Sequence, residues 1–169
     1  MQISVTPATE ADRPIFENLI QLYVYDFTDF KEWDVEENGR FKDYGLEGCW
    51  TEDYRHPFLI RVNSKLAGFA IIDGRSQLNE AYGTWDFSDV FILRRYQKRG
   101  VGEHVVRSLF DRFCGCWEVR IIAANHRALA FWRTVISRYT DGRFEEVTWN
   151  NARWHGPVLF FDNSARQKS

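Results

Sequence analysis

The sequence is poor in cysteine and has no excess of either charge sign. Its three cysteines are too few, and odd in number, for a disulfide framework, so we expect a reducing, cytoplasmic location. The 22 Lys and Arg residues nearly balance the 24 Asp and Glu residues, and the formal net charge is −2. This balance gives no general electrostatic reason to bind nucleic acid.

Long hydrophobic runs are also missing. No apolar stretch approaches the roughly 18 residues that a membrane-spanning helix needs, so we expect no membrane association. The first residues show no basic region followed by an apolar stretch, so no secretory signal is predicted. No metal site is expected, because no histidines or cysteines have the spacing of metal ligands.

The two common nucleotide-binding loops are absent as well. A Walker A loop needs Gly-x-x-x-x-Gly-Lys-Ser/Thr, and no such run occurs. A dinucleotide-binding loop needs Gly-x-Gly-x-x-Gly, but Gly100 and Gly102 are followed by Val105 where the third glycine is required. The sequence therefore predicts neither kind of nucleotide-binding loop.

What is present is an ordinary globular composition that is rich in aromatic residues. Hydrophobic residues make up 44% of the chain and aromatic residues 17%. A chain of 169 residues suits one domain with a sizeable core. We therefore predict a single domain over residues 1–162, followed by a polar, disordered tail over residues 163–169.

Hydrophobic periodicity predicts a chain of the α/β or α+β class. Apolar segments with strand spacing lie at residues 3–5, 58–62, 66–73, 84–93, 117–124, 144–149 and 157–162. Apolar faces with helical spacing lie within residues 9–27, 101–113 and 125–136. The stretch from residue 26 to residue 53 is irregular and acidic, and we expect a short helix and loops there.

The loop that follows the fourth predicted strand is the most informative segment. It reads Tyr96-Gln97-Lys98-Arg99-Gly100-Val101-Gly102 and leads directly into a helix. The first N–H groups of a helix have no partner within it, and the helix dipole favours negative charge there. Glycines allow a ligand to approach the backbone closely. This order of strand, basic glycine loop and helix predicts a site for a phosphate-bearing ligand.

The chain resembles the GNAT acyltransferase superfamily. The residues from Gln97 to Gly102 match the family signature Gln/Arg-x-x-Gly-x-Gly/Ala, and the segment from Asn125 to Ala128 matches its Asn-x-x-Ala pattern. The predicted order of strands and helices is similar along the whole domain. The resemblance implies a mixed, mostly antiparallel sheet of six to seven strands, which opens between strands four and five and is flanked by about four helices.

The resemblance also implies that the chain binds acetyl-CoA as its acyl donor. Pantetheine would pair with the backbone of the fourth strand, and the pyrophosphate would lie on the backbone amides of the glycine loop, near an asparagine that begins the later helix. The corresponding residues are Val90, Phe91, Ile92, Gln97, Lys98, Arg99, Gly100, Val101, Gly102, Glu103 and Asn125.

One position departs from the family pattern. The residue seven positions after Asn125 is often a tyrosine that protonates the departing thiolate, but here it is Trp132. An indole N–H cannot act as a general acid at neutral pH. Tyr139, one to two turns further along the same helix, is therefore the candidate acid, and water is the alternative.

The amine acceptor must lose a proton, which requires a base. The fourth strand offers Asp86 and Asp89, which simple alternation places on opposite faces. Either could instead be a solvated surface carboxylate. Glu118 on the fifth strand is a weaker candidate and is expected to be exposed.

In this family the first helix and the segment after it form one wall of the acceptor site. Here that wall is acidic and aromatic, and the candidate contacts are Tyr25, Asp26, Phe27 and Trp33. Carboxylates and aromatic faces attract cationic amines, so a polyamine, an aminosugar, another amino compound or a protein terminus would fit. The alternative is an ordinary charged, solvated surface.

The sequence thus predicts an N-acetyltransferase that moves an acetyl group from acetyl-CoA to a primary amine by direct attack. We expect a monomer or a homodimer. A non-catalytic acyl-CoA-binding or sensing module on the same fold is the alternative, because a fold does not determine an activity. A structural or partner-binding protein whose loop holds no cofactor is the third possibility.

Overall fold

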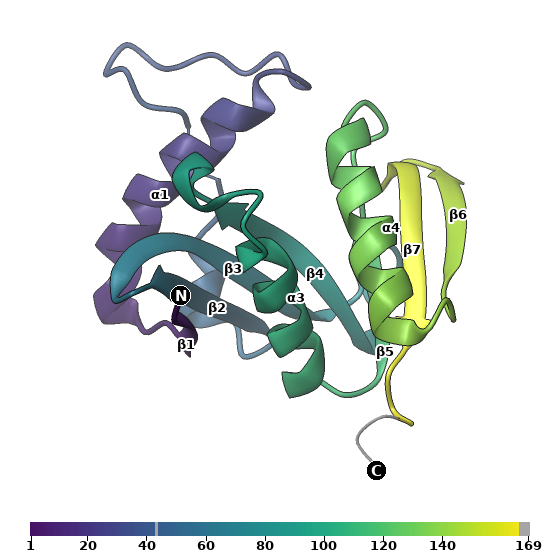
Figure 1. Cartoon of the computed structure of the whole chain (residues 1–169). Helices are drawn as coiled ribbons and strands as arrows, with labels where there is room; N and C mark the ends of the chain where they lie inside the picture. The colour runs from purple at the N-terminus through teal and green to yellow at the C-terminus, as the bar shows by residue number, and fades with distance from the viewer. Residues whose placement is uncertain (43, 166–169) are drawn as a thin grey trace.

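The computed structural model describes residues 1–42 and 44–165, which form a single seven-stranded sheet with helices on both faces (Figure 1). The strands are β1 (Ile3–Pro7), β2 (Arg55–Val62), β3 (Lys65–Arg75), β4 (Tyr82–Ile92), β5 (Cys116–Arg120), β6 (Glu145–Asn150) and β7 (His155–Asp162). Their order across the sheet is β1-β2-β3-β4-β5-β7-β6. Only β4 and β5 are parallel, so the predicted mixed and mostly antiparallel sheet is confirmed.

The helices divide between the two faces of this sheet. A short 3₁₀ turn, η1 (Glu10–Asp12), leads into α1 (Arg13–Phe27), and a single turn, α2 (Gly48–Thr51), precedes β2. A second 3₁₀ turn, η2 (Arg94–Tyr96), precedes α3 (Val101–Arg112), and α4 (His126–Thr140) follows β5. Figure 1 shows α3 and α4 in front of the sheet and α1 behind it.

Each face therefore has its own hydrophobic core. The buried side of α1, which includes Phe16 and Ile20, packs against Phe69, Ile71 and other apolar residues of the central strands. The second core is larger and lies beneath α3 and α4. It holds most of the buried aromatic residues, and the ring of Phe87 contacts those of Phe110, Trp117 and Trp132.

Two boundaries differ from the sequence prediction. The fifth strand was expected to reach residue 124, but β5 ends at Arg120, and Ile121 keeps a single backbone hydrogen bond to Pro157. The polar tail was expected to begin at Asn163, yet this residue is buried and its Nδ2 donates to the carbonyl oxygen of Phe110 at 2.6 Å. Asn163 caps the core, and residues 166–169 of the predicted tail lie outside the described residues.

No helix in the described part of the chain combines the length and the apolar character required to span a membrane.

Candidate active site

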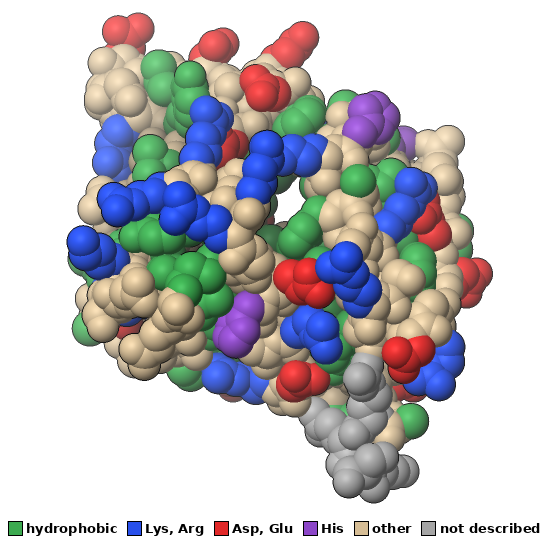
Figure 2. All heavy atoms as spheres, in the orientation of Figure 1, with side chains coloured by type: hydrophobic (Ala, Val, Ile, Leu, Met, Phe, Trp, Pro, Cys, Tyr) green, Lys and Arg blue, Asp and Glu red, His purple; other side chains and the backbone are tan. Residues whose placement is uncertain are grey.

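The sheet opens between β4 and β5. The two strands pair only through residues 84–86 of β4 and residues 116–118 of β5, although β4 continues to Ile92. Beyond this point β4 has a sheet neighbour on the β3 side alone. Figure 2 shows the result as an opening through the molecule, with Lys and Arg side chains gathered beside and above it. The predicted opening between the fourth and fifth strands is thus confirmed.

The free edge of β4 presents backbone groups to this opening. The N–H of Leu93 donates to the carbonyl oxygen of Ala67, at the start of β3. Backbone groups of successive residues in a strand point to opposite sides, so those of Phe91 also point toward β3. The N–H and C=O groups of Val90 and Ile92 therefore face the opening. Of the three strand residues named as pantetheine contacts, Val90 and Ile92 turn backbone groups away from β3, whereas the backbone of Phe91 turns toward it.

The glycine loop and the first turn of α3 carry a run of backbone amides, from Lys98 to Glu103, with no backbone acceptor among the described residues. Lys98 and Gly100 both have left-handed backbone conformations, with φ of 57° and 77°. Such turns direct successive N–H groups to the same side, and the unpaired N–H groups of the first helical turn extend the row. A Cβ at Gly100 would meet no atom within 4 Å, so lack of space does not explain the glycine. Its left-handed backbone conformation does, because residues with a Cβ rarely adopt it.

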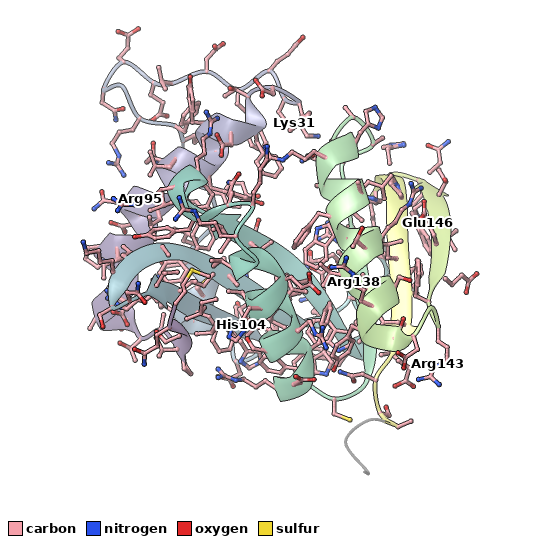
Figure 3. The ribbon with its side chains drawn as sticks, viewed as in Figure 1. Lys31, Arg95, His104, Arg138, Arg143 and Glu146 are labelled. Atoms are coloured by element: carbon pink, nitrogen blue, oxygen red, sulfur yellow. The ribbon has the colours of Figure 1, made fainter. Side chains whose placement is uncertain are left out.

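Exposed cations surround this row of amides. Lys98 and Arg99 lie in the loop, Arg95 lies on η2 (Figure 3), and Arg127 lies at the start of α4 across the opening. Gln97 has a structural role, because its Nε2 donates to the carbonyl oxygen of Ile92 at 2.7 Å and its Oε1 accepts from Arg127 at 2.8 Å. The signature glutamine thereby joins the end of β4 to the start of α4.

Three more predicted residues lie around α3 and α4. Asn125 caps α4, with its Oδ1 accepting the N–H of Ala128 at 3.0 Å, as its helix-start position predicted. Glu103, in the first turn of α3, pairs with Arg138 of α4 at 3.0 Å (Figure 3). Trp132 is a core residue whose ring packs against Phe87 of β4, at 4.9 Å between centroids.

Tyr139 does not lie at the opening, which contradicts its prediction as the acid. It occupies the last turn of α4, at the opposite end of the helix from Asn125. Its ring is buried against Phe110 and Phe161, and its hydroxyl donates to Asp111 Oδ1 at 2.8 Å. Its position on the apolar stripe of α4 gives it a role in the core.

A β-bulge in β4 decides on which face of the sheet its carboxylates lie. Adjacent residues of β3 pair with Phe87 and Asp89, so Ser88 is one extra residue on β4. The prediction that Asp86 and Asp89 lie on opposite faces is wrong, because the extra residue shifts the alternation by one. Both carboxylates lie on the face that carries Ile71 and is covered by α1.

This face holds a buried charged cluster. Its carboxylates are at most 6% exposed and belong to Asp73, Asp86, Asp89 and Glu118. Two arginines compensate part of the charge: Arg55 pairs with Asp73 at 3.0 Å, and Arg120 pairs with Asp86 at 3.0 Å. With four carboxylates and two arginines, the cluster has an excess of acidic groups. The described residues include no group of three or more His, Cys, Asp or Glu arranged to hold a metal ion.

Glu118 was expected to be exposed but is 2% exposed. Its Oε2 accepts from the hydroxyl of Ser76 and its Oε1 from the N–H of Gln77, both at 2.7 Å. Both oxygens are therefore occupied by the turn after β3. The carboxylate therefore fixes that turn.

Asp86 is fully buried, and both of its oxygens accept from Arg120, at 3.1 and 3.0 Å. Burial raises the pKa of Asp86 to about 7, although the guanidinium of Arg120 lowers it. The loss of hydration thus outweighs the ion pair. The guanidinium of Arg120 also lies over the ring of Trp154, at 4.9 Å from its centroid, so the β6–β7 turn contributes to the cluster.

Asp89 has a different environment, because hydroxyl groups rather than a cation hold it. Tyr23 of α1 donates to Asp89 Oδ1 at 2.7 Å, and Tyr44 donates to the same oxygen at 3.1 Å. Within the described residues, no hydrogen bond reaches Asp89 Oδ2. One oxygen of this carboxylate is therefore held in place and the other is free to accept.

Aromatic rings extend from this carboxylate along the connection between α1 and α2. Tyr23 contacts Phe27 at 4.6 Å between centroids, and Phe27 stacks on Trp33 at 6.5 Å. Of the predicted acceptor wall, Phe27 and Trp33 thus lie in the aromatic group beside the charged cluster. Tyr25 is 62% exposed, and Asp26 pairs with Arg94 of η2 at 2.7 Å.

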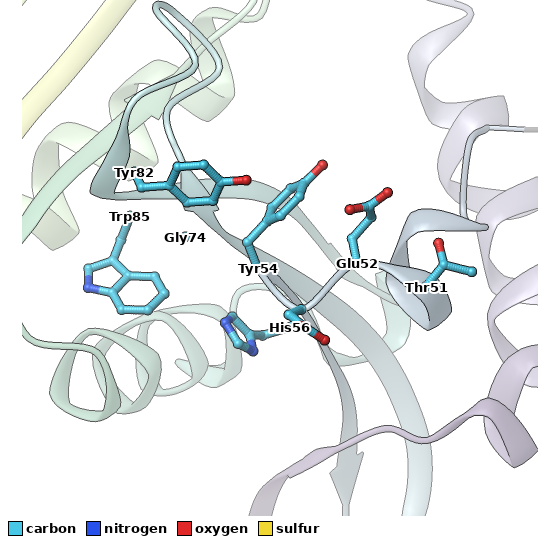
Figure 4. A pocket seen from close by; sticks show the side chains of 8 residues that line it. Thr51, Glu52, Tyr54, His56, Gly74, Tyr82 and Trp85 are labelled. Atoms are coloured by element: carbon cyan, nitrogen blue, oxygen red, sulfur yellow. The ribbon is translucent and has the colours of Figure 1, made fainter.

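A separate hollow of about 510 Å³ lies at the other end of the sheet (Figure 4). Tyr54, His56, Tyr82 and Trp85 contribute to its lining. His56 and Trp85 contact Phe113 beyond the end of α3, so they lie on the face opposite the charged cluster. The hollow is therefore distinct from the opening between β4 and β5.

Sequence reasoning missed several residues of the cluster. Tyr44 lies in an irregular segment without periodicity, so nothing local indicated its contact with β4. Arg120 was missed although it left a signal: it lies two positions after Glu118, which was named but expected to be exposed, in a strand that is otherwise apolar. Such spacing places both charges on one face of a buried strand, which is unusual unless they have partners.

Solved structures share this fold at low sequence identity. The ribosomal-protein-S18-alanine N-acetyltransferase from Escherichia coli has a TM-score of 0.60 at 14% identity, covering 94% of this chain and 91% of that chain. An acetyltransferase from Thermus thermophilus has a TM-score of 0.62 at 15% identity, covering 95% of both chains. The spermidine N-acetyltransferase from Vibrio cholerae, solved with CoA and spermine, has a TM-score of 0.62 at 12% identity, covering 96% of both.

These similarities define the class: the chain has an acetyltransferase fold. A comparison of the sequence with curated proteins found no significant match. The sequence profile of the Acetyltransferase (GNAT) family matches residues 16–135. The chain belongs to the GNAT acetyltransferase family, as the glycine loop predicted.

Proposed function

We propose that this protein is an N-acetyltransferase that transfers the acetyl group of acetyl-CoA to a primary amine of a cationic acceptor. One observation carries the proposal. The strand that borders the opening, β4, leads into a loop with unpaired backbone amides on the α3 side and carries buried carboxylates on the α1 side. A phosphate-bearing acyl donor fits the first surface, and an amine that must lose a proton fits the second.

The donor side fits coenzyme A in its chemistry. The amides from Lys98 to Glu103 and the start of α3 suit a pyrophosphate, and the surrounding cations add attraction for its charge. The N–H and C=O of Val90 and the N–H of Ile92 suit the amides of a pantetheine chain, which pair like an added strand, whereas the carbonyl oxygen of Ile92 already accepts from Gln97. When bound, acetyl-CoA supplies a thioester as the acetyl donor. A backbone N–H of Val90 or Ile92 polarises its carbonyl oxygen.

On the acceptor side, Asp89 takes the proton of the substrate ammonium group. Its Oδ2 has the free acceptor capacity that this step needs, while Asp86 is held at both oxygens by Arg120. The neutral amine then attacks the acetyl carbon, the new C–N bond forms and the C–S bond breaks. The second proton of the nitrogen leaves to solvent, and the thiolate takes a proton from water, since neither Trp132 nor Tyr139 is placed to supply one.

A cationic acceptor fits because the cluster holds more carboxyl groups than arginines. Burying a carboxylate without a counter-charge is costly, so an ammonium group that enters the site offsets this cost. The rings of Phe27 and Trp33 add faces that attract cations. Among the proteins of similar fold, the Vibrio cholerae enzyme is described with spermine, which has this chemistry.

The test has two measurements. Calorimetry with acetyl-CoA measures donor binding, and release of the coenzyme A thiol measures transfer to a panel of spermidine, an aminoglycoside and a peptide with an N-terminal alanine. Binding together with amine-dependent thiol release supports the proposal. Binding without release for any amine favours the acyl-CoA-sensing alternative, and no binding contradicts both.

A further inference from the structure

The connection between α1 and α2 brings a tyrosine to the carboxylate of β4. Tyr44 is 45 residues from Asp89 in the sequence, yet its hydroxyl lies 3.1 Å from Asp89 Oδ1. Its ring also contacts Tyr23 edge-on, at 5.6 Å between centroids, and Trp33 at 6.3 Å. One side chain therefore touches the proton acceptor, the helix that supports it and the outer aromatic wall.

Both tyrosines act as donors to Asp89. Burial raises the pKa of Tyr23 and of Tyr44, and the nearby charge of Asp89 raises them further. Each hydroxyl thus keeps its proton throughout the neutral range. A hydroxyl that donates to a carboxylate favours the ionised form of that carboxylate. Two donors on Oδ1 also limit the rotation of the carboxylate.

Other ionisable groups act on Asp89 from every element packed around it. They are Tyr23 of α1, Tyr44 of the α1–α2 connection, Cys49 of α2, Arg55 of β2, Asp73 of β3 and Arg120 of β5. Both arginines have carboxylate partners of their own, Asp73 and Asp86. The tyrosine hydroxyls are therefore the groups whose direct contact is dedicated to Asp89.

We propose that Tyr44 is a positioning residue, which holds Asp89 with its Oδ2 directed to the acceptor and links the aromatic wall to that carboxylate. The inference rests on the proposed function. An amine that lies against Trp33 lies against a ring that touches Tyr44, so the wall that binds the acceptor also supports its proton acceptor. Residues from the α1–α2 connection thereby complete a site whose carboxylates come from the sheet.

The test is the variant Tyr44→Phe, which keeps the ring and removes the hydroxyl. With acetyl-CoA and spermidine, or whichever panel amine the unaltered protein turns over best, the acidic limb of the kcat/KM profile should move to higher pH by about one unit. The expected loss is about tenfold on that limb, since one pH unit is a factor of ten. Tyr23→Phe should act in the same direction, and the affinity for acetyl-CoA should not change.

Two controls separate positioning from packing. Tyr82→Phe removes a hydroxyl from a tyrosine that is 71% exposed and far from the cluster, and its profile should match that of the unaltered protein. In an Asp89→Asn background, Tyr44→Phe should cause no further loss, because the carboxylate on which it acts is absent. If Tyr44→Phe still lowers kcat/KM tenfold in the Asp89→Asn background, Tyr44 does not act through Asp89 and the inference is wrong.

The outcomes also separate this inference from the proposed function. If the unaltered protein releases no thiol with any amine, the proposed function fails and the positioning role fails with it. If the unaltered protein is active and Tyr44→Phe has an unchanged pH profile, the positioning role alone is wrong. A shifted profile with unchanged donor affinity supports both.

Discussion

The two sides of the sheet opening differ in the groups that form them: backbone amides on one side and side chains on the other. On the α3 side, backbone amides of one short segment, residues 98–103, form the surface, and exposed cations surround it. On the α1 side, buried side chains from several strands and helices and from the α1–α2 connection meet in one cluster. The first surface depends on the path of the backbone, whereas the second depends on the identity of each side chain.

The difference gives the two sides different vulnerabilities. A backbone surface is lost when a side chain fills it or adds the wrong charge. A buried charged cluster is lost when one member is removed and its partner stays behind without compensation. Variants on the α3 side should therefore affect the donor alone, and variants on the α1 side should affect the acceptor, the pH dependence or the stability.

The largest effect is expected from Gly102→Asp on the donor side. The new carboxylate would occupy the first turn of α3 and repel a pyrophosphate there, so acetyl-CoA binding should fall at least about a thousandfold. Calorimetry with acetyl-CoA measures this. Asn63→Asp, in the β2–β3 turn outside the glycine loop, adds the same charge and should leave the affinity unchanged. Equal loss in both variants would refute the assignment of the loop.

Asp89→Asn should have the next largest effect, on the acceptor side. Removing a general base typically reduces the rate by about 10²–10⁴-fold, and we expect kcat to fall within this range with donor affinity unchanged. Asp53→Asn, an exposed carboxylate outside the cluster, is the matched control. If kcat falls less in Asp89→Asn than in Asp86→Asn, the proton acceptor is Asp86 and not Asp89.

Arg120→Met tests the compensation of charge within the cluster. Arg120 lowers the pKa of Asp86, so its removal should raise that pKa above about 7. When folding raises the pKa of a carboxyl group, the folded state loses stability as the pH rises. The loss occurs between the pKa of the group in the unfolded chain and its pKa in the folded protein. The free energy of unfolding should therefore fall by about 3 kcal/mol at pH 8 and by less at pH 5, where Asp86 is protonated.

Urea denaturation at the two pH values measures this difference. Arg133→Met removes an exposed arginine that pairs with Glu146, and it should cost less than about 1 kcal/mol at either pH. If Arg120→Met is equally destabilising at pH 5 and pH 8, the uncompensated charge of Asp86 is not the cause.

The smallest effect is expected from Trp33→Ala in the aromatic wall. A cation over an aromatic ring contributes about 1 kcal/mol, so KM for the acceptor should rise about fivefold while KM for acetyl-CoA stays the same. Tyr25→Ala is the comparison, because Tyr25 is 62% exposed, whereas the ring contacts of this wall join Tyr23, Phe27 and Trp33. Equal increases for both variants would mean that the acceptor does not lie against Trp33.

The sequence predicted the α3 side of the opening better than the α1 side. The donor side depends on local signals, a strand, a glycine loop and a helix start, and these were readable in seven consecutive residues. The order of elements and the opening between the fourth and fifth strands followed from the family resemblance. On the acceptor side, Asp86 and Asp89 were found as residues, but their faces were not, because a single bulge at Ser88 reverses the alternation.

The remaining errors have related causes. Tyr139 was chosen for its chemistry and its helix, whereas burial against Phe110 and a bond to Asp111 hold it in the core. Tyr44 was missed because its contact with Asp89 spans 45 residues and depends on how the α1–α2 connection lies on the sheet. Contacts of this kind depend on tertiary packing and leave no local pattern.

The most direct test of this account is a structure of the protein with coenzyme A and an acceptor amine. The account predicts the pyrophosphate on the amides at the start of α3, and the amine nitrogen on the α1 side within about 2.6–3.2 Å of Asp89 Oδ2. An amine nitrogen on the α3 side of the sheet, or out of reach of Asp89, would contradict it.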